Sequence, residues 1–116
     1  MLAAQRIMVV EDELSAAQLF KRWVSSVGYE VVTAPTAENA LTRLAQQHYD
    51  LVLTDVDLPG RSGLDLTRIV QERYPKMPVV VTTGHRSLDV ASAAVSSGAL
   101  GFILKPMNKQ ILVERI

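Results

Sequence analysis

The sequence predicts a doubly wound α/β fold, in which helices cover both faces of a five-stranded parallel sheet. Short runs of β-branched and aliphatic residues alternate five times with longer segments that have helical spacing. Three of the runs are almost continuously apolar, as expected of strands buried on both faces of a parallel sheet. The length of 116 residues suits one domain rather than two.

The five predicted strands are separated by segments long enough for a helical crossover. The last strand is weaker than the other four, because it begins with a glycine. The runs are Ile7 to Val10, Val31 to Thr33, Leu51 to Thr54, Val79 to Thr82 and Gly101 to Leu104.

A helix is predicted after every strand, and most of these helices carry a recognisable start or stop. The first has apolar residues from Leu14 onward and stops at Gly28. The second begins after Thr36, a residue type that favours the N-cap position. Ser62 and Asp65 resemble a capping box at the start of the third helix, which ends before the proline at position 75.

The two remaining helices lie in the last third of the chain. The fourth is predicted from about Leu88 to Ser97 and stops at Gly98, whereas the fifth starts near Asn108 and continues to Ile116. No repeat, linker or low-complexity tract divides residues 1–116. We expect this single domain to be the N-terminal part of a longer protein with its last helix cut short.

Composition excludes several functional classes. Twelve basic and twelve acidic residues cancel, which argues against a nucleic-acid surface in this domain. The absence of cysteine excludes disulfides, thiolate metal sites and thiol catalysis. The first 13 residues form neither a signal peptide nor a membrane span. We therefore expect a cytoplasmic location and no membrane partner.

Polar residues that suit chemistry follow four of the predicted strands. Glu11 and Asp12 follow the first strand, Asp55 the third, Thr83 the fourth and Lys105 the fifth. Each alone is commonplace, because acids cap helices and turns, threonine is a common strand residue and lysine is usually a solvated charge. The carboxyl ends of parallel strands share one edge of the sheet, so their coincidence predicts one site.

Electrostatics indicates what such a site would hold. Two carboxylates about 4 Å apart repel by roughly 4 kcal/mol at an effective dielectric constant near 20. Glu11, Asp12 and Asp55 therefore need a proton or a cation, and an oxygen-only ligand set favours Mg²⁺. A divalent cation, the ammonium of Lys105 and a hydroxyl around one carboxylate would suit phosphoryl transfer, with that carboxylate as nucleophile.

At this point the sequence resembles the receiver domains of two-component response regulators, the CheY-like superfamily, from Ile7 to the end of the chain. The segments that carry the resemblance are VVEDE at 9–13, LVLTDVDLPGRSGLDL at 51–66, VVVTTGH at 79–85 and GALGFILKP at 98–106. The resemblance implies a flavodoxin-like sheet with strand order 2-1-3-4-5. It also implies a partner that is a sensor histidine kinase or a histidine phosphotransfer protein.

The resemblance also implies a role for each matching residue. Asp55 corresponds to the phospho-acceptor, which takes its phosphoryl group from a phosphohistidine. Glu11 and Asp12 correspond to the acidic pair that binds Mg²⁺ together with Asp55, and Asp57 would offer its backbone carbonyl to the metal. Lys105 corresponds to the lysine that contacts a phosphoryl oxygen, before a proline whose peptide bond is often cis.

A switch is implied as well. The hydroxyl of Thr83 would move to meet the phosphoryl group, and the ring of Phe102 would turn inward behind it. The surface of the fourth helix, fifth strand and fifth helix would then change and meet an output domain, a partner or a second copy of the chain. The expected function is that of a signalling switch, most simply in transcription regulation, and not of an enzyme that turns over external substrates.

Four residues depart from the usual pattern of the family. Glu11 stands where aspartate is commoner, as a longer arm that should leave metal binding intact. Phe102 lacks a tyrosine hydroxyl, so a switch there would rest on burial of the ring. Gly84 replaces a frequent alanine, which would open the phosphoryl group to water. Thr82 competes with Thr83 as the switch hydroxyl, although the small Gly84 favours Thr83.

Three other functions are alternatives to that of a receiver domain. Asp55-Val56-Asp57 imitates the nucleophile motif of haloacid-dehalogenase-type phosphatases, but those enzymes place their metal-binding acids after the lysine. A flavodoxin-type binding module needs a phosphate-cradling loop where this chain has acids. A pseudo-receiver that only docks partners would not need the complete residue set. The type of output stays open: His85 suggests transcription activators, and Asp89 lies on a fourth helix without Arg or Lys.

Overall fold

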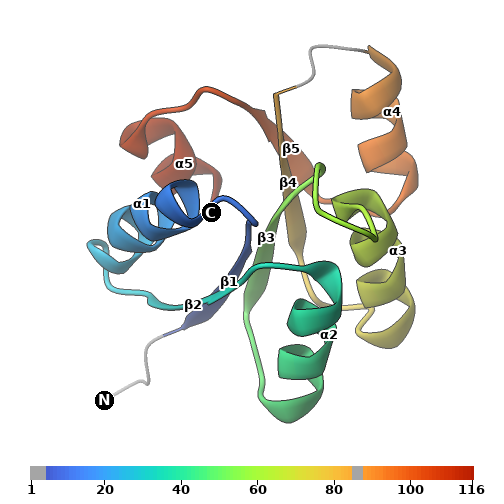
Figure 1. Cartoon of the computed structure of the whole chain (residues 1–116), viewed down its shortest axis with the longest axis horizontal. Coiled ribbons are helices and arrows are strands. Elements are labelled where there is room, and N and C mark those ends of the chain that lie inside the picture. The colour runs from blue at the N-terminus through green and yellow to red at the C-terminus, as the bar shows by residue number, and fades with distance from the viewer. Residues whose placement is uncertain (1–4, 85–87) are drawn as a thin grey trace.

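The computed structural model describes residues 5–84 and 88–116, and it contains one sheet of five parallel strands in the order β2-β1-β3-β4-β5 (Figure 1). The predicted α/β architecture and strand order are confirmed. Each strand begins or ends within one residue of its predicted position. The strands are β1 (Arg6–Val10), β2 (Glu30–Ala34), β3 (Leu51–Asp55), β4 (Val79–Thr83) and β5 (Gly101–Leu104).

A helix follows every strand in the described part of the chain, as predicted. Two of these helices, α1 and α5, lie on one face of the sheet, and the other three cover the opposite face (Figure 1). The helices are α1 (Leu14–Ser25), α2 (Ala37–Gln46), α3 (Gly63–Arg73), α4 (Leu88–Ser96) and α5 (Lys109–Arg115). None of the helices in the described ranges is long and apolar enough to cross a membrane.

The core has two halves because side chains alternate across each strand. In β1, Ile7 and Val9 belong to the cluster under α1 and α5, whereas Met8 and Val10 belong to the cluster under the other three helices. All residues of β3 and β4 are buried. The nearly continuous apolar runs are thus explained by helices on both sides of a central sheet.

Three of the predicted helix starts are visible as side-chain caps. The hydroxyl of Thr36 accepts a hydrogen bond from the backbone of Asn39 at 3.0 Å, and Asn108 caps α5 in the same way. Ser62 accepts from the backbone of Asp65 at 3.1 Å, but the carboxylate of Asp65 binds the guanidinium of Arg68. Ser62 therefore acts as an N-cap, but Asp65 does not return the hydrogen bond that would complete a capping box.

The ends of β3 and β4 matter most for function. Asp55 is the last residue of β3 and pairs with Thr82, while Thr83 is the last residue of β4 and pairs with Leu104. Backbone pairing with a neighbouring strand extends each strand one residue beyond its apolar run. Both polar side chains therefore start from rigid strand positions. The candidate output marker His85 lies outside the described residues.

Candidate functional site

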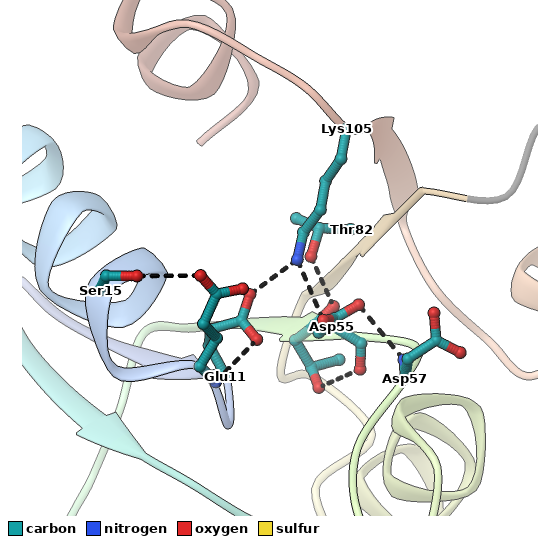
Figure 2. Close-up of polar contacts among 8 residues, drawn as sticks. Glu11, Ser15, Asp55, Asp57, Thr82 and Lys105 are labelled. Atoms are coloured by element: carbon teal, nitrogen blue, oxygen red, sulfur yellow. Dashed lines mark hydrogen bonds and ion pairs between the residues drawn. The ribbon is translucent and has the colours of Figure 1, made fainter.

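Three charged side chains from strand ends far apart in the sequence meet at the carboxyl edge of the sheet (Figure 2). The ammonium of Lys105, just after β5, donates to Glu11 Oε1 at 2.7 Å and to Asp55 Oδ2 at 3.0 Å. Glu11, just after β1, and Asp55 are both buried. The predicted convergence of these residues on one edge is what the parallel sheet produces.

Asp55 is held through both of its carboxylate oxygens. Oδ2 accepts from Lys105, and Oδ1 accepts from the backbone N–H of Asp57 at 3.2 Å. The side chain of Asp55 is only 9% exposed, at the end of a strand whose residues are all buried. The carboxylate is thus fixed in position while a small part of its surface still faces solvent.

An acidic cluster surrounds this position. Glu11, Asp12 and Asp55 each offer a carboxylate oxygen, and these oxygens all lie within 4.8 Å of one another. Burial raises the pKa of Glu11 above its ordinary value, and the charge of Asp55 raises it further, although the hydrogen bond from Lys105 opposes both effects. Asp12 is exposed, so the cluster opens to solvent on its side.

Lys105 is the cation that balances part of this charge. Burial disfavours its ammonium, but the hydrogen bonds to Glu11 and Asp55 outweigh that effect and raise its pKa above the ordinary value. Its ammonium also lies 5.9 Å from the centre of the Phe20 ring. The peptide bond between Lys105 and Pro106 is cis, as the resemblance led us to expect.

The two candidate switch hydroxyls are both buried at the end of β4. Thr82 donates to the backbone carbonyl of Thr54 at 3.5 Å, toward the neighbouring strand β3. Thr83 is the next residue and therefore points to the other face of the sheet. The choice of Thr83 rather than Thr82 as the switch hydroxyl stays a prediction.

Phe102 is half-buried and packs against the core cluster under α2, α3 and α4. It also lines a groove of about 630 Å³ along α4, β5 and α5, together with Val95, Leu100 and Ile111. These three neighbours are exposed hydrophobic side chains. The predicted aromatic position thus connects the core to an apolar surface.

A second groove adjoins the acidic site. It has a volume of about 470 Å³, and apolar residues of α1, among them Phe20 and Trp23, line one side of it. Lys105 and Gly84 line the other side, so the groove reaches the edge of the site. Gly84 is exposed there, and a Cβ atom added to it would meet no atom of the described residues within 4 Å.

Two features of the site were not predicted. Gly63, the first residue of α3, lies so close to β3 that a Cβ atom there would overlap the backbone carbonyl of Asp55. A glycine directly after the N-cap Ser62 was a visible signal, because glycine has poor helix propensity. The ion pair between Glu11 and Lys105 was not foreseen either, since the two residues are 94 positions apart.

Comparison with known proteins agrees with this geometry. The family described as "Response regulator receiver domain" matches residues 7–116. The response regulator protein PilR of Pseudomonas aeruginosa is 35% identical over 115 residues, which cover 99% of this chain and 26% of PilR. The DNA-binding transcriptional regulator NtrC of Salmonella typhimurium is 32% identical over 112 residues, 94% of this chain and 24% of NtrC.

A solved structure gives the same result. The CheY-like receiver domain from Methanospirillum hungatei superposes with a TM-score of 0.92 at 30% identity, covering 97% of this chain and 90% of that one. This chain spans about a quarter of the length of the curated relatives it matches. Three observations point to the same family: the strand order, the acidic edge of the sheet and the family match over residues 7–116. The chain belongs to the receiver domains of two-component response regulators.

Proposed function

We propose that this receiver domain accepts a phosphoryl group on Asp55 from a phosphohistidine of a sensor kinase or a histidine phosphotransfer protein. The observation that carries the proposal is the position of the Asp55 carboxylate. It lies at a strand end, fixed by Lys105 and the backbone of Asp57, beside two further acids. A fixed carboxylate beside an ammonium, at a partly open edge, suits attack on phosphorus.

In the proposed transfer, a carboxylate oxygen of Asp55 forms a bond to phosphorus while the bond from phosphorus to the imidazole nitrogen breaks. The imidazole leaves with the electron pair and takes up a proton. Lys105 can then contact a phosphoryl oxygen, because its ammonium already lies 3.0 Å from the carboxylate that carries the group. The product is an aspartyl phosphate at Asp55.

The donor set fits a bound Mg²⁺. Three carboxylates and one ammonium leave an excess of two negative charges, which a divalent cation would neutralise. Oxygen-only ligands suit a hard cation. Glu11, Asp12 and Asp55 would hold the ion with the backbone carbonyl of Asp57, and the ion would supply charge neutralisation for the phosphoryl oxygens.

We propose that Thr83 and Phe102 transmit the phosphorylation of Asp55 to the surface along α4, β5 and α5. Thr83 is buried at the end of β4, and Phe102 lies between the core and the apolar groove along α4, β5 and α5. Phosphorylation would draw the hydroxyl of Thr83 toward the new acceptor oxygens, and the ring of Phe102 would follow into the space. The groove would then present a changed surface to a partner or to a second copy.

The output is proposed to be control of transcription within a longer, cytoplasmic protein. NtrC, which is similar over 112 residues, is a DNA-binding transcriptional regulator, and this chain covers only 24% of it. Nucleic-acid binding would then belong to another part of such a protein, because the chain described here has no net positive charge. The receiver would act as a switch and not as an enzyme with an external substrate.

Labelling tests the proposal. Incubation with acetyl phosphate and Mg²⁺ should add the mass of one phosphoryl group to the wild type, as measured by intact-mass spectrometry. Asp55→Asn should add none, whereas Asp65→Asn should be labelled like the wild type, because Asp65 is an exposed carboxylate on α3. Equal labelling of the wild type and Asp55→Asn would contradict the assignment.

A further inference from the structure

The sheet has an open edge at β5, the last strand in the order β2-β1-β3-β4-β5. Thr83 of β4 pairs with Leu104, and the backbone N–H of Lys105 donates to the carbonyl of Thr83 at 2.7 Å. Successive residues of a strand turn their N–H and C=O groups toward opposite edges. The backbone groups of Ile103 therefore face β4, whereas those of Phe102 and Leu104 face outward.

A side chain of α5 covers part of this edge. The guanidinium of Arg115 donates to the backbone carbonyl of Phe102 at 3.2 Å, in an exposed hydrogen bond. The bond agrees with the outward direction of that carbonyl. A charged side chain over an edge strand keeps other strands from pairing there. Arg115 thus occupies one of the main-chain acceptors that a further strand would use.

The open edge lies in the groove of about 630 Å³ along α4, β5 and α5. Residues of α4 line it on one side of β5 and residues of α5 on the other, as the places of the two helices in Figure 1 indicate. Among the described residues that line the groove, Arg115 alone is charged, and the others are glycine or apolar. Open main-chain groups, apolar walls and one cation are together the features of a site for an extended, acidic peptide.

We propose that the groove binds an extended segment of a partner protein, which adds to the sheet as a strand beside β5 and carries a carboxylate for Arg115. An N–H group of the segment would replace Arg115 at the carbonyl of Phe102, and the guanidinium would turn to the carboxylate. Apolar side chains at alternate positions of the segment would contact the walls. This inference rests on the output surface proposed above, because it names the kind of partner that this surface takes.

A second copy of the chain does not fit the groove in this way. Its own β5 lies between α4 and α5 in an identical groove, so the helices of the two copies would meet before the two strands could pair. Two copies can still associate through the exposed side chains of these helices. Only a segment without flanking helices reaches the backbone of β5, and the occupant is therefore an extended peptide.

Two capped peptides of seven residues test the charge of the partner. In one, valine alternates with glutamate, so that the two residue types lie on opposite faces of the extended chain. In the other, lysine replaces glutamate. Isothermal titration calorimetry with the unphosphorylated chain should show binding of the glutamate peptide, and binding of the lysine peptide that is at least about ten-fold weaker, because Arg115 attracts the first and repels the second. Equal affinities, or no binding of either peptide, would overturn the proposal.

Replacement of the cation tests the role of Arg115. In Arg115→Met, the preference for the glutamate peptide should fall to about two-fold, because a charge pair near the surface accounts for up to about a five-fold change in affinity. This ratio does not depend on the carbonyl of Phe102 that the substitution uncovers, since both peptides gain from it equally. Arg22→Met removes an exposed arginine from the last turn of α1 and should leave the preference unchanged. A preference that persists in Arg115→Met would contradict the charge pair.

Strand addition is tested on the wild type and does not depend on how a variant folds. Methylation of every second main-chain nitrogen of the glutamate peptide removes N–H groups from one edge only. One of the two alternate methylation patterns should abolish binding, and the other should leave the affinity within about three-fold. Equal effects of the two patterns would rule out pairing with the edge of β5.

Hydrogen exchange locates the pairing. At a saturating concentration of the glutamate peptide, the amide protons of Phe102 and Leu104 should exchange at least about ten-fold more slowly, while that of Ile103, which faces β4, serves as the internal control. Unchanged exchange at Phe102 and Leu104 would overturn strand addition. Labelling of Asp55 by acetyl phosphate in the same sample distinguishes failure of the peptide site from failure of the proposed phosphorylation.

Discussion

At the scale of single residues, the receiver site is a group of like charges held together by one cation. Glu11, Asp12 and Asp55 have carboxylate oxygens within 4.8 Å of one another, and Lys105 contacts two of these acids. Such crowding costs folding free energy, and the metal binding proposed above would account for it, because residues arranged for a ligand are not arranged for stability. The raised pKa of Glu11 has burial as its main cause and the neighbouring Asp55 as a further one.

Replacement of the exposed acid should therefore stabilise the metal-free protein. Asp12→Asn removes a charge that repels Glu11 and Asp55, and we expect the free energy of unfolding to rise by about 1 kcal/mol at pH 7. Urea denaturation without Mg²⁺ measures it. The advantage should shrink or reverse in excess Mg²⁺, because the variant has lost a metal ligand. Destabilisation of the metal-free variant would contradict the repulsion.

At the scale of elements, the site depends on how closely α3 approaches the end of β3. The backbone N–H of Gly63 donates to the carbonyl of Val56 at 2.9 Å, and the hydroxyl of Thr67 donates to the carbonyl of Gly63 at 2.7 Å. The helix thus begins directly against the strand that carries Asp55. Any side chain at position 63 would have to displace that strand.

Gly63→Ala should therefore be costly. The new Cβ atom would overlap the backbone carbonyl of Asp55, and we expect a loss of roughly 1–3 kcal/mol in the free energy of unfolding, typical of overpacking. Thermal denaturation and acetyl phosphate labelling would both report the change. Gly101→Ala is the control, since no atom lies within 4 Å of a Cβ there and its effect should be small. Equal stabilities of the two variants would contradict the close approach.

At the amino ends of β1 and β3, away from the site, the start of β1 is held by a hydrogen bond to the carboxylate of Asp50. Asp50 accepts a hydrogen bond from the backbone N–H of Arg6 at 2.7 Å, and this bond, together with the nearby His48, lowers the pKa of Asp50 below its ordinary value of 3.8. A lowered pKa means that the folded state binds a proton less readily than the unfolded state. The stabilisation is therefore present above pH 3.8 and is lost as the pH falls further.

Asp50→Asn should remove this pH dependence. At pH 7 we expect the variant to lose on the order of 1 kcal/mol, because the carboxylate is partly exposed and a neutral amide oxygen is a weaker acceptor. The difference from the wild type should become smaller below about pH 4, where the wild-type carboxylate also takes up a proton. Denaturation curves between pH 3 and pH 7 would show it, and a constant difference would contradict the linkage.

At the scale of the whole molecule, the apolar groove runs along the edge strand β5, which ends directly before Lys105 of the site. The exposed side chains of Val95, Leu100 and Ile111 line the groove, and Phe102 joins it to the core. Exposed apolar residues gathered on one face favour association. The proposed switch would connect phosphorylation at Asp55 with burial of this face.

Association should therefore depend on phosphorylation. With acetyl phosphate and Mg²⁺, we expect the molar mass measured by light scattering to rise toward that of a dimer. Leu100→Asp should abolish the rise without changing the labelling of Asp55. Leu14→Asp is the matched control, because Leu14 is a similarly exposed leucine on α1. A dimer that persists in Leu100→Asp would place the interface elsewhere.

The sequence by itself determined the alternation of strands and helices, because apolar periodicity reflects which faces are buried. It also indicated Glu11, Asp55, Thr83 and Lys105 as neighbours, since parallel strands end at one edge of the sheet. The roles of these residues stay predictions that labelling and titration can test.

Only the tertiary structure decided how the site is arranged inside. Lys105 contacts Glu11 across 94 positions of sequence, and Gly63 lies against the backbone of Asp55. No local pattern encodes these contacts, because they depend on side-chain reach and on how closely packed elements approach. The sequence predicted a site at four strand ends. In the folded chain, Lys105 lies between Glu11 and Asp55 at this site. The helix α3 can approach the end of β3 so closely only because residue 63 is a glycine.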